Sequence, residues 1–270
     1  LGRVGGRWFP NRTPERRRAL YDEVRRLADE RYGPEVDSWL APNLRVRSYL
    51  LREGTYEQLS ALGMWEAELR ADATVTEERR DPDGVFVLAL EGRLLGRGDR
   101  PLLFERRGDR LMWVPPEELR GQLPDRVLDM TGALPRAQMR TVIRLPWNKT
   151  EFVVPGRHEL VLAPAPDGYV TPVVRTEARI DPATAAGGSK PRMGRWEVLA
   201  AVTVCGFAVT GRVRSKRTAA AYELAIDAHG NVLSRRGAIL SAAKGKLARA
   251  VPGLARLARR AQERRAAASH

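Results

Sequence analysis

One stretch, residues 194–214, limits the fold of this chain more than any other. Most of its apolar residues are β-branched or aromatic and a glycine lies near its middle, which predicts two strands joined by a tight turn. In the second arm Phe207, Val209 and Val213 fall on alternate positions, as in a strand with one buried face. Trp196 is in phase with the apolar residues of the first arm, so we expect its ring at the inner face of a sandwich.

The rest of the segment from residue 73 to residue 234 also shows the alternation typical of β-strands. Asp81-Pro82-Asp83-Gly84 predicts a hairpin turn, because proline fixes one backbone dihedral and glycine accepts a positive φ. Arg107-Gly108-Asp109 predicts a second turn of this kind. The remaining predicted strands lie at 138–145, 151–154, 158–163, 169–180 with a break at Pro172, 221–226 and 231–234.

Short strands separated by turn residues, with no helices between them, favour an antiparallel arrangement. We therefore predict an α+β chain whose residues 73–234 form antiparallel immunoglobulin-like β-sandwiches. One elaborated sandwich and two small ones, with a boundary near residue 165, both remain open.

The first 72 residues predict a helical linker segment. Thr13 is a good N-cap and Pro14 suits the first position of a helix that ends near Gly33. A second helix is predicted from 43 to 53, and Thr55 is expected to cap a third. Their apolar residues recur at helical spacing, so we expect these faces to pack against one another and against a neighbour.

Residues 235–270 predict a basic amphipathic helix. The net charge of this tail is +9 out of +14 for the whole chain, so the body before it is only mildly basic. It could contact an acidic partner such as an anionic polymer, or a membrane surface, or remain a solvated tail that contacts nothing. Binding to nucleic acid is disfavoured, because that would need a basic stripe on the folded body. The residues expected to make anionic contacts are Lys244, Lys246, Arg249, Arg256, Arg259 and Arg260.

No pattern in the chain predicts a catalytic centre, a metal site or a bound cofactor. Asp81 and Asp83 form a D-x-D motif, but the charged run before it and the glycine after it indicate a turn. The three histidines have no partner at metal-ligand spacing. The single cysteine, Cys205, is expected to be a small buried residue. Three aromatic residues near predicted strand ends are candidates for stacking on sugar rings: Trp113, Trp147 and Tyr169.

Four segments carry a resemblance to a known family. They are residues 44–54, Trp65-Glu66, the Asp-Pro loop 180–188 and the Gly-Arg-Trp-Glu-Val sequence 194–198. In this order they resemble the region C-terminal to the catalytic domain of bacterial family 2 glycosyltransferases, in particular multidomain enzymes that build or decorate teichoic-acid-like polymers. The resemblance spans about residues 12–214. It implies a helical linker followed by immunoglobulin-like sandwiches, with roles in oligomerisation, positioning and polymer contact.

The first hypothesis is therefore a non-catalytic module of a cell-wall glycosyltransferase whose catalytic domain lies upstream. The chain begins with Leu1, and we expect it to be part of a longer polypeptide. The alternative is a free-standing carbohydrate- or polymer-binding β-sandwich protein. No apolar run of about 18 residues and no signal peptide is visible. We expect a cytoplasmic protein, with the inner face of the membrane as an option for the tail.

Overall fold

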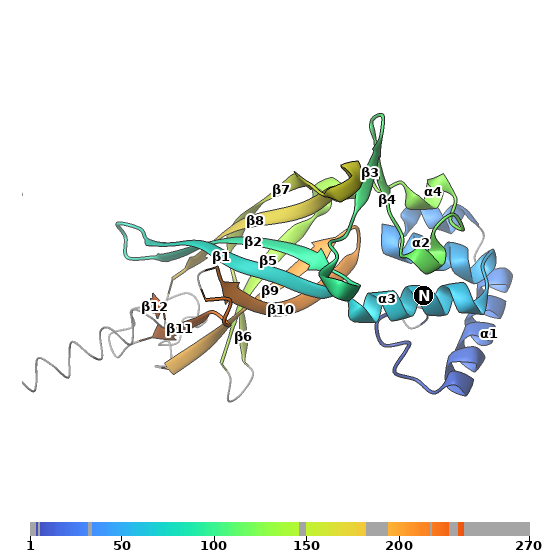
Figure 1. Cartoon of the computed structure of the whole chain (residues 1–270). Helices are drawn as coiled ribbons and strands as arrows, with labels where there is room; N and C mark the ends of the chain where they lie inside the picture. Colours follow the sequence, from blue (N-terminus) through green and yellow to red (C-terminus); the bar gives the residue numbers. More distant parts are fainter. Residues whose placement is uncertain are drawn as a thin grey trace, which may run out of the picture.

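The computed structural model describes residues 4, 6–31, 34–145, 150–181, 194–216, 218–226 and 232–234. Trp147 and the basic tail 235–270 lie outside these residues. Helices gather at one end of the molecule and strands at the other (Figure 1). The described α-helices are α1 (Pro14–Arg31), α2 (Pro42–Arg52), α3 (Tyr56–Glu68) and α4 (Asp125–Leu128). The 3-10 helices are η1 (Pro34–Trp39), η2 (Arg97–Asp99), η3 (Glu117–Leu119), η4 (Leu134–Arg136) and η5 (Pro166–Gly168).

The predicted helix starts are confirmed. The amide of Arg16 donates to the hydroxyl of Thr13 at 3.4 Å, and Pro14 is the first residue of α1. At α3 the hydroxyl of Thr55 accepts from the amide of Gln58, while the Gln58 side chain accepts from the amide of Thr55. This reciprocal capping box satisfies two backbone donors that would otherwise lack partners at the start of a helix.

The described strands form one mostly antiparallel sheet of twelve strands. Their bounds are β1 (Arg70–Arg80), β2 (Phe86–Leu95), β3 (Phe104–Arg107), β4 (Arg110–Trp113), β5 (Gln138–Arg144), β6 (Glu151–Val154), β7 (Gly156–Pro164), β8 (Val170–Ile180), β9 (Gly194–Val204), β10 (Phe207–Ser215), β11 (Glu223–Ile226) and β12 (Val232–Ser234). The predicted hairpin at 194–214 is confirmed as β9 and β10, paired from Phe207 with Val204 to Arg212 with Leu199.

Two features of the sheet differ from the sequence prediction. First, β1 and β10 pair in parallel, with Ala73 opposite Val213, and this pair joins the two halves of the sheet. Second, Pro172 does not break β8. It lies opposite Leu162 of β7, whereas β2 pairs with β8 only from Val174 onward, so the missing N–H of Pro172 removes no bond to β2.

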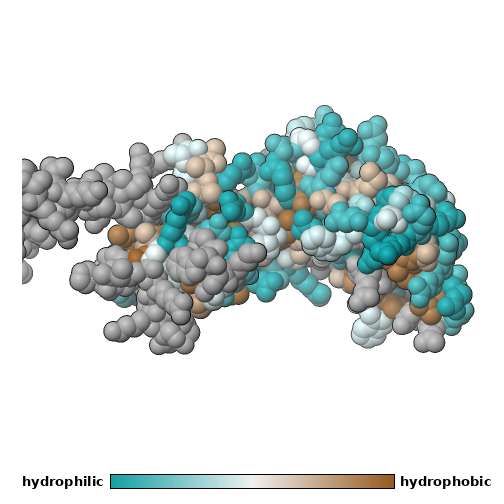
Figure 2. All heavy atoms as spheres, turned by 90° about the horizontal axis from the view of Figure 1, so that it is seen from below, coloured by the Kyte–Doolittle hydropathy of each residue, from teal (hydrophilic) through white to brown (hydrophobic). Residues whose placement is uncertain are grey.

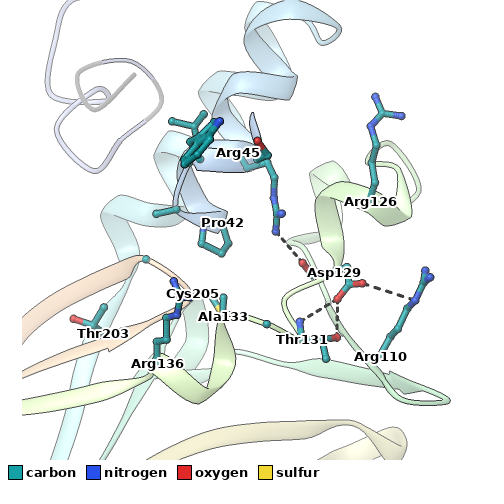
Figure 3. A pocket seen from close by; sticks show the side chains of 16 residues that line it. Pro42, Arg45, Arg110, Arg126, Asp129, Thr131, Ala133, Arg136, Thr203 and Cys205 are labelled. Atoms are coloured by element: carbon teal, nitrogen blue, oxygen red, sulfur yellow. Dashed lines mark hydrogen bonds and ion pairs between the residues drawn. The ribbon is translucent and has the colours of Figure 1, made fainter. Parts of the chain in front are cut away.

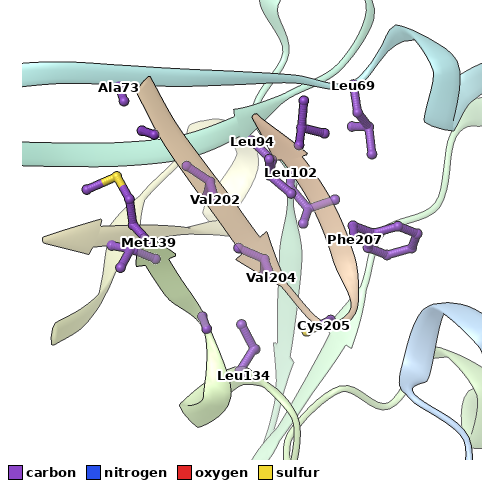
Figure 4. Close-up of a cluster of buried hydrophobic side chains, with 14 of the residues drawn as sticks. Leu69, Ala73, Leu94, Leu102, Leu134, Met139, Val202, Val204, Cys205 and Phe207 are labelled. Atoms are coloured by element: carbon purple, nitrogen blue, oxygen red, sulfur yellow. The ribbon is translucent and has the colours of Figure 1, made fainter. Parts of the chain in front are cut away.

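The two halves of the sheet face each other across a common core. On β2, Gly92 lies so close to the opposite half that an added Cβ would stand 2.4 Å from the sulfur of Met139 and 3.2 Å from Val202. Figure 4 shows Met139, Val202, Val204 and Phe207 within the buried cluster between the strands. The turn between β7 and β8, near residue 165, lies within a hairpin paired over nine positions.

An aromatic cluster connects the helical end to the sheet. The ring of Trp65 on α3 lies 5.2 Å from that of Trp113 on β4 and 5.1 Å from that of Phe207 on β10. The hydrophobic core is therefore continuous from the helices into the strands. The surface differs from this interior, because Figure 2 shows mainly hydrophilic residues over one face of the helical end, with apolar residues between them.

Candidate functional site

A cavity of about 890 Å³ opens where the helical end meets the tip of the β9–β10 hairpin. One wall is the start of α2 with the segment before it, and a second is the hairpin turn. A third wall is the segment around α4 and η4, which the sequence did not assign to any element. Figure 3 shows these walls with the side chains that line them.

The hairpin tip is held on the start of α2. Cys205 and Gly206 both have positive φ angles, 51° and 86°, as the two central residues of a tight hairpin turn often do. The amide of Asn43 on α2 donates to the carbonyl oxygen of Cys205 at 3.2 Å. A Cβ on residue 206 would stand 2.1 Å from Oδ1 of Asn43, so glycine is required at this position both for its φ and for the close contact.

The opposite wall is a turn centred on Asp129. Its Oδ1 accepts from the amide of Thr131 at 3.0 Å and from the Thr131 hydroxyl at 2.6 Å. That hydroxyl also accepts from the amide of Leu111 at 2.9 Å. The hydrogen bond from the Thr131 side chain lowers the pKa of Asp129, and Arg110, 3.8 Å from Oδ2, acts in the same direction. Asp129 is therefore a fixed, ionised carboxylate.

Arginines dominate the charge of the cavity lining. Arg45, Arg110, Arg126 and Arg136 line it together with one acidic residue, Asp129, which leaves a net charge of three positive. Among the described residues no carboxylate lies within ion-pair distance of Arg45, Arg126 or Arg136, whereas many other arginines of this chain are paired.

The cationic side chains differ in how they are held. Arg45 donates from Nη2 to the carbonyl oxygen of Asp129 at 2.9 Å, and its Nε is buried with no acceptor in the described part of the protein. Arg126 lies with its guanidinium carbon 5.5 Å from the centre of the Tyr49 ring. In Figure 3, Arg136 projects from η4 towards the hairpin turn, and Arg126 points away from the other arginines.

The cavity lining suits binding of an anion. Guanidinium groups without carboxylate partners bind phosphate or carboxylate oxygens through paired N–H donors. The thiol of Cys205 also lines the cavity, but burial raises its pKa to about 12, so the sulfur is protonated near neutral pH. In the described part of the chain, no group of three or more His, Cys, Asp or Glu side chains is placed to hold a metal ion.

The two described aromatic residues that were predicted to bind sugars, Trp113 and Tyr169, do not line this cavity. Trp113 is 1% exposed inside the aromatic cluster, so its ring has no free face on which a sugar could stack. Tyr169 is half-buried and follows η5. Trp147 and the six basic residues of the tail fall outside the described residues. An exposed aromatic that the sequence analysis did not single out, Trp39, lines the cavity and is 88% exposed.

Sequence reasoning also missed the arginines of the cavity. One local signal was present, since α2 contains three arginines, Arg45, Arg47 and Arg52, and no acidic residue. Arg47 pairs with Glu66 of α3 and Arg52 pairs with Asp37 of η1, which leaves Arg45 for another role. No comparable signal marks Arg126 or Arg136.

Within the residues that the structure describes, no helix combines the length and the apolar character needed to cross a bilayer.

Residues 1–63 match the family model of the glycosyl transferase TarS linker domain, which covers less than half of the chain. The matched region holds α1, η1, α2 and most of α3, and hence Arg45 and the start of α2. No curated protein matches the chain.

Proposed function

We propose that this chain is a non-catalytic module of a glycosyltransferase that acts on a teichoic-acid-type cell-wall polymer. In this proposal the catalytic domain precedes the helical segment in the natural polypeptide. The helices act as the linker, and the β-rich part positions the enzyme on its polymer or on further copies of itself. The match of residues 1–63 to the TarS linker domain carries the proposal.

The packing of the matched helices supports a linker that transmits position. Val46, Leu50 and Leu51 of α2 are at most 1% exposed and belong to the same hydrophobic core as the strands. The main chain of α2 is also bonded to the hairpin tip through Cys205. A domain attached to these helices would therefore keep a fixed orientation relative to the sheet, because a continuous core resists relative movement.

Steady-state kinetics would test the proposal. The natural polypeptide that contains this chain is compared with a version that ends before residue 1, using a nucleotide-sugar donor and a polyol phosphate acceptor. We expect removal of the chain to raise KM for the polymer several-fold and to leave KM for the donor unchanged. Sedimentation of both proteins reports whether the chain also carries self-association.

The chain itself is the matched control in the same assay, and we expect it to transfer no sugar. Sugar transfer by the chain alone would contradict the proposal. An unchanged KM for the polymer together with an unchanged sedimentation coefficient would contradict it equally.

A further inference from the structure

We infer that the arginine-lined cavity is a binding site for a chain of phosphodiester groups, with Arg45 and Arg136 as its principal phosphate contacts. The juxtaposition of α2, the β9–β10 turn and η4 brings these two residues together from distant parts of the sequence. That the phosphates belong to a polyol phosphate polymer rests on the proposed function. The anion site itself rests on the cavity.

The positive charge of the lining favours an anionic partner. The lining holds four arginines and one carboxylate, and that carboxylate is already bonded to Thr131. Like charges brought together at a partly buried surface repel one another, and an anion between them removes the repulsion. Arg45 donates from Nη2 only to the backbone carbonyl oxygen of Asp129, so its charge is not neutralised by a carboxylate among the described residues.

The size of the cavity favours a chain of phosphates over a single ion. At about 890 Å³ it lies in the upper range of ligand pockets, far beyond the volume of one phosphate. Three uncompensated charges suit a ligand with repeated negative charge. The exposed ring of Trp39 at the same cavity offers an apolar surface for the carbon atoms of a polyol between two phosphates.

The start of α2 adds to the positive potential. Pro42 and Ala41 line the cavity, so the positive end of the helix dipole faces it. The recessed shape favours a threaded chain over a lipid surface, because a flat bilayer reaches only the rim of a concavity. Anionic lipid is therefore treated as a competing outcome of the test.

Gly132 allows a test that leaves the fold intact. It lines the cavity, and a Cβ added there meets no atom within 4 Å. Gly132→Glu places a carboxylate among the arginines, while Gly132→Gln places an uncharged side chain of the same size. The probe is a fluorescent glycerol- or ribitol-phosphate oligomer of a few repeats, titrated with the full chain at low and physiological salt.

We expect Gly132→Glu to weaken binding at least tenfold and Gly132→Gln to change it less than threefold. A second variant, Arg45→Gln with Arg136→Gln, should lose at least tenfold as well. Its control is Arg106→Gln with Arg157→Gln, which removes the same charge from exposed positions outside the cavity. Thermal unfolding of each variant reports whether it is folded.

Three results would overturn the inference. They are equal losses in the cavity variants and the control pair, equal losses in the Glu and Gln variants at residue 132, and binding to phosphatidylglycerol vesicles but not to the oligomer. The proposed function fails separately. If the natural polypeptide transfers no sugar while the cavity variants still lose oligomer binding, the phosphate site stands and the enzyme context does not.

Discussion

The backbone amide of Asn43 donates a hydrogen bond to the carbonyl oxygen of Cys205 at 3.2 Å, and this bond joins the start of α2 to the tip of the β9–β10 hairpin. The bond satisfies a donor in the first turn of the helix, where no intrahelical acceptor exists. It also places the helical end and the β9–β10 hairpin on the same cavity. The hairpin tip is thus a second contact between the helical end and the sheet, besides the aromatic cluster around Trp65.

Replacement of Gly206 by alanine should weaken the contact between the hairpin tip and the start of α2. The φ of 86° would strain an alanine, and its Cβ would clash with Oδ1 and Cγ of Asn43. We expect a loss of about 2–4 kcal/mol in the free energy of unfolding, measured by chemical denaturation. Gly108→Ala is the control, since its φ is 62° but nothing lies within 4 Å of the added atom, and we expect it to lose about 1 kcal/mol. Equal losses at the two glycines would show that the contact with Asn43 contributes nothing.

The buried ion pair between α2 and α3 gives a second prediction. Arg47 and Glu66 are each 6% exposed, and Nε of Arg47 donates to Oε1 of Glu66 at 3.2 Å. Burial raises the pKa of Glu66 above 4.5, and Arg47 opposes this shift. Glu66→Ala should lose about 3 kcal/mol of stability, because Arg47 is left buried without an acceptor. Glu66→Gln retains an acceptor and should change stability at pH 7 by less than about 1 kcal/mol.

The pH dependence of that pair follows from the sign of the shift. The unfolded chain releases the proton of Glu66 near pH 4.5, before the folded protein does, so wild type loses stability as pH rises through this window. The stability of Glu66→Gln relative to wild type should therefore increase between pH 4 and pH 7 in urea titrations. A relative stability that decreases over that range would contradict the direction given for Glu66.

Replacement of both Arg47 and Glu66 by Met and Leu should restore most of the stability lost in Glu66→Ala.

The thiol of Cys205 gives a third prediction. Burial raises its pKa from 9.0 to about 12, and it is the single cysteine of the sequence, so labelling reports on it alone. We expect the native protein at pH 8 to react with a thiol reagent at least a hundredfold more slowly than the protein in denaturant, because the thiolate is the reactive form. Rapid labelling of the native protein, at the rate of a free thiol, would show that the hairpin tip opens away from α2.

The sequence predicted the local elements because their causes are local. The reciprocal cap of Thr55 and Gln58 and the alternation around Phe207 are both visible within a few residues, and both are confirmed. The parallel pairing of β1 with β10 was not predictable in this way. A strand that pairs in parallel has the same two-residue period as an antiparallel one, and Ala73 and Val213 are far apart in the chain. The immunoglobulin-like connectivity and the domain boundaries stay predictions.

The cavity was missed for a related reason. The segment 114–137 has neither a helical nor a strand period, because it folds into short 3-10 turns and one turn of α-helix. Of these, α4 packs against α2 and η3 packs against α3. Arg136 ends the last of these turns, and only the tertiary fold brings it near Arg45. Arg45 and Arg136 have no carboxylate within ion-pair distance among the described residues, and this too depends on the tertiary fold. The spacing of residues in the sequence therefore does not predict it.

The carboxylate of Glu197 gives a fourth prediction. It lies on β9 and accepts hydrogen bonds from arginines of two neighbouring strands, β5 and β10. It accepts from Arg144 of β5 at 2.6 and 3.0 Å and from Arg212 of β10 at 2.9 Å. The hydrogen bond from Arg144 lowers the pKa of Glu197, so its contribution to stability is present above the unfolded value of 4.5 and is lost as pH falls through the folded value. Glu197→Gln should lose about 1–2 kcal/mol at pH 7, and its difference from wild type should disappear at acidic pH, as measured by denaturant unfolding across that range. The control is Glu91→Gln, which removes a single, more exposed pair with Arg175 and should lose about 0.5 kcal/mol or less. If the difference between Glu197→Gln and wild type instead persisted undiminished in acid, the strands would be held by the shape of the side chain and not by its charge.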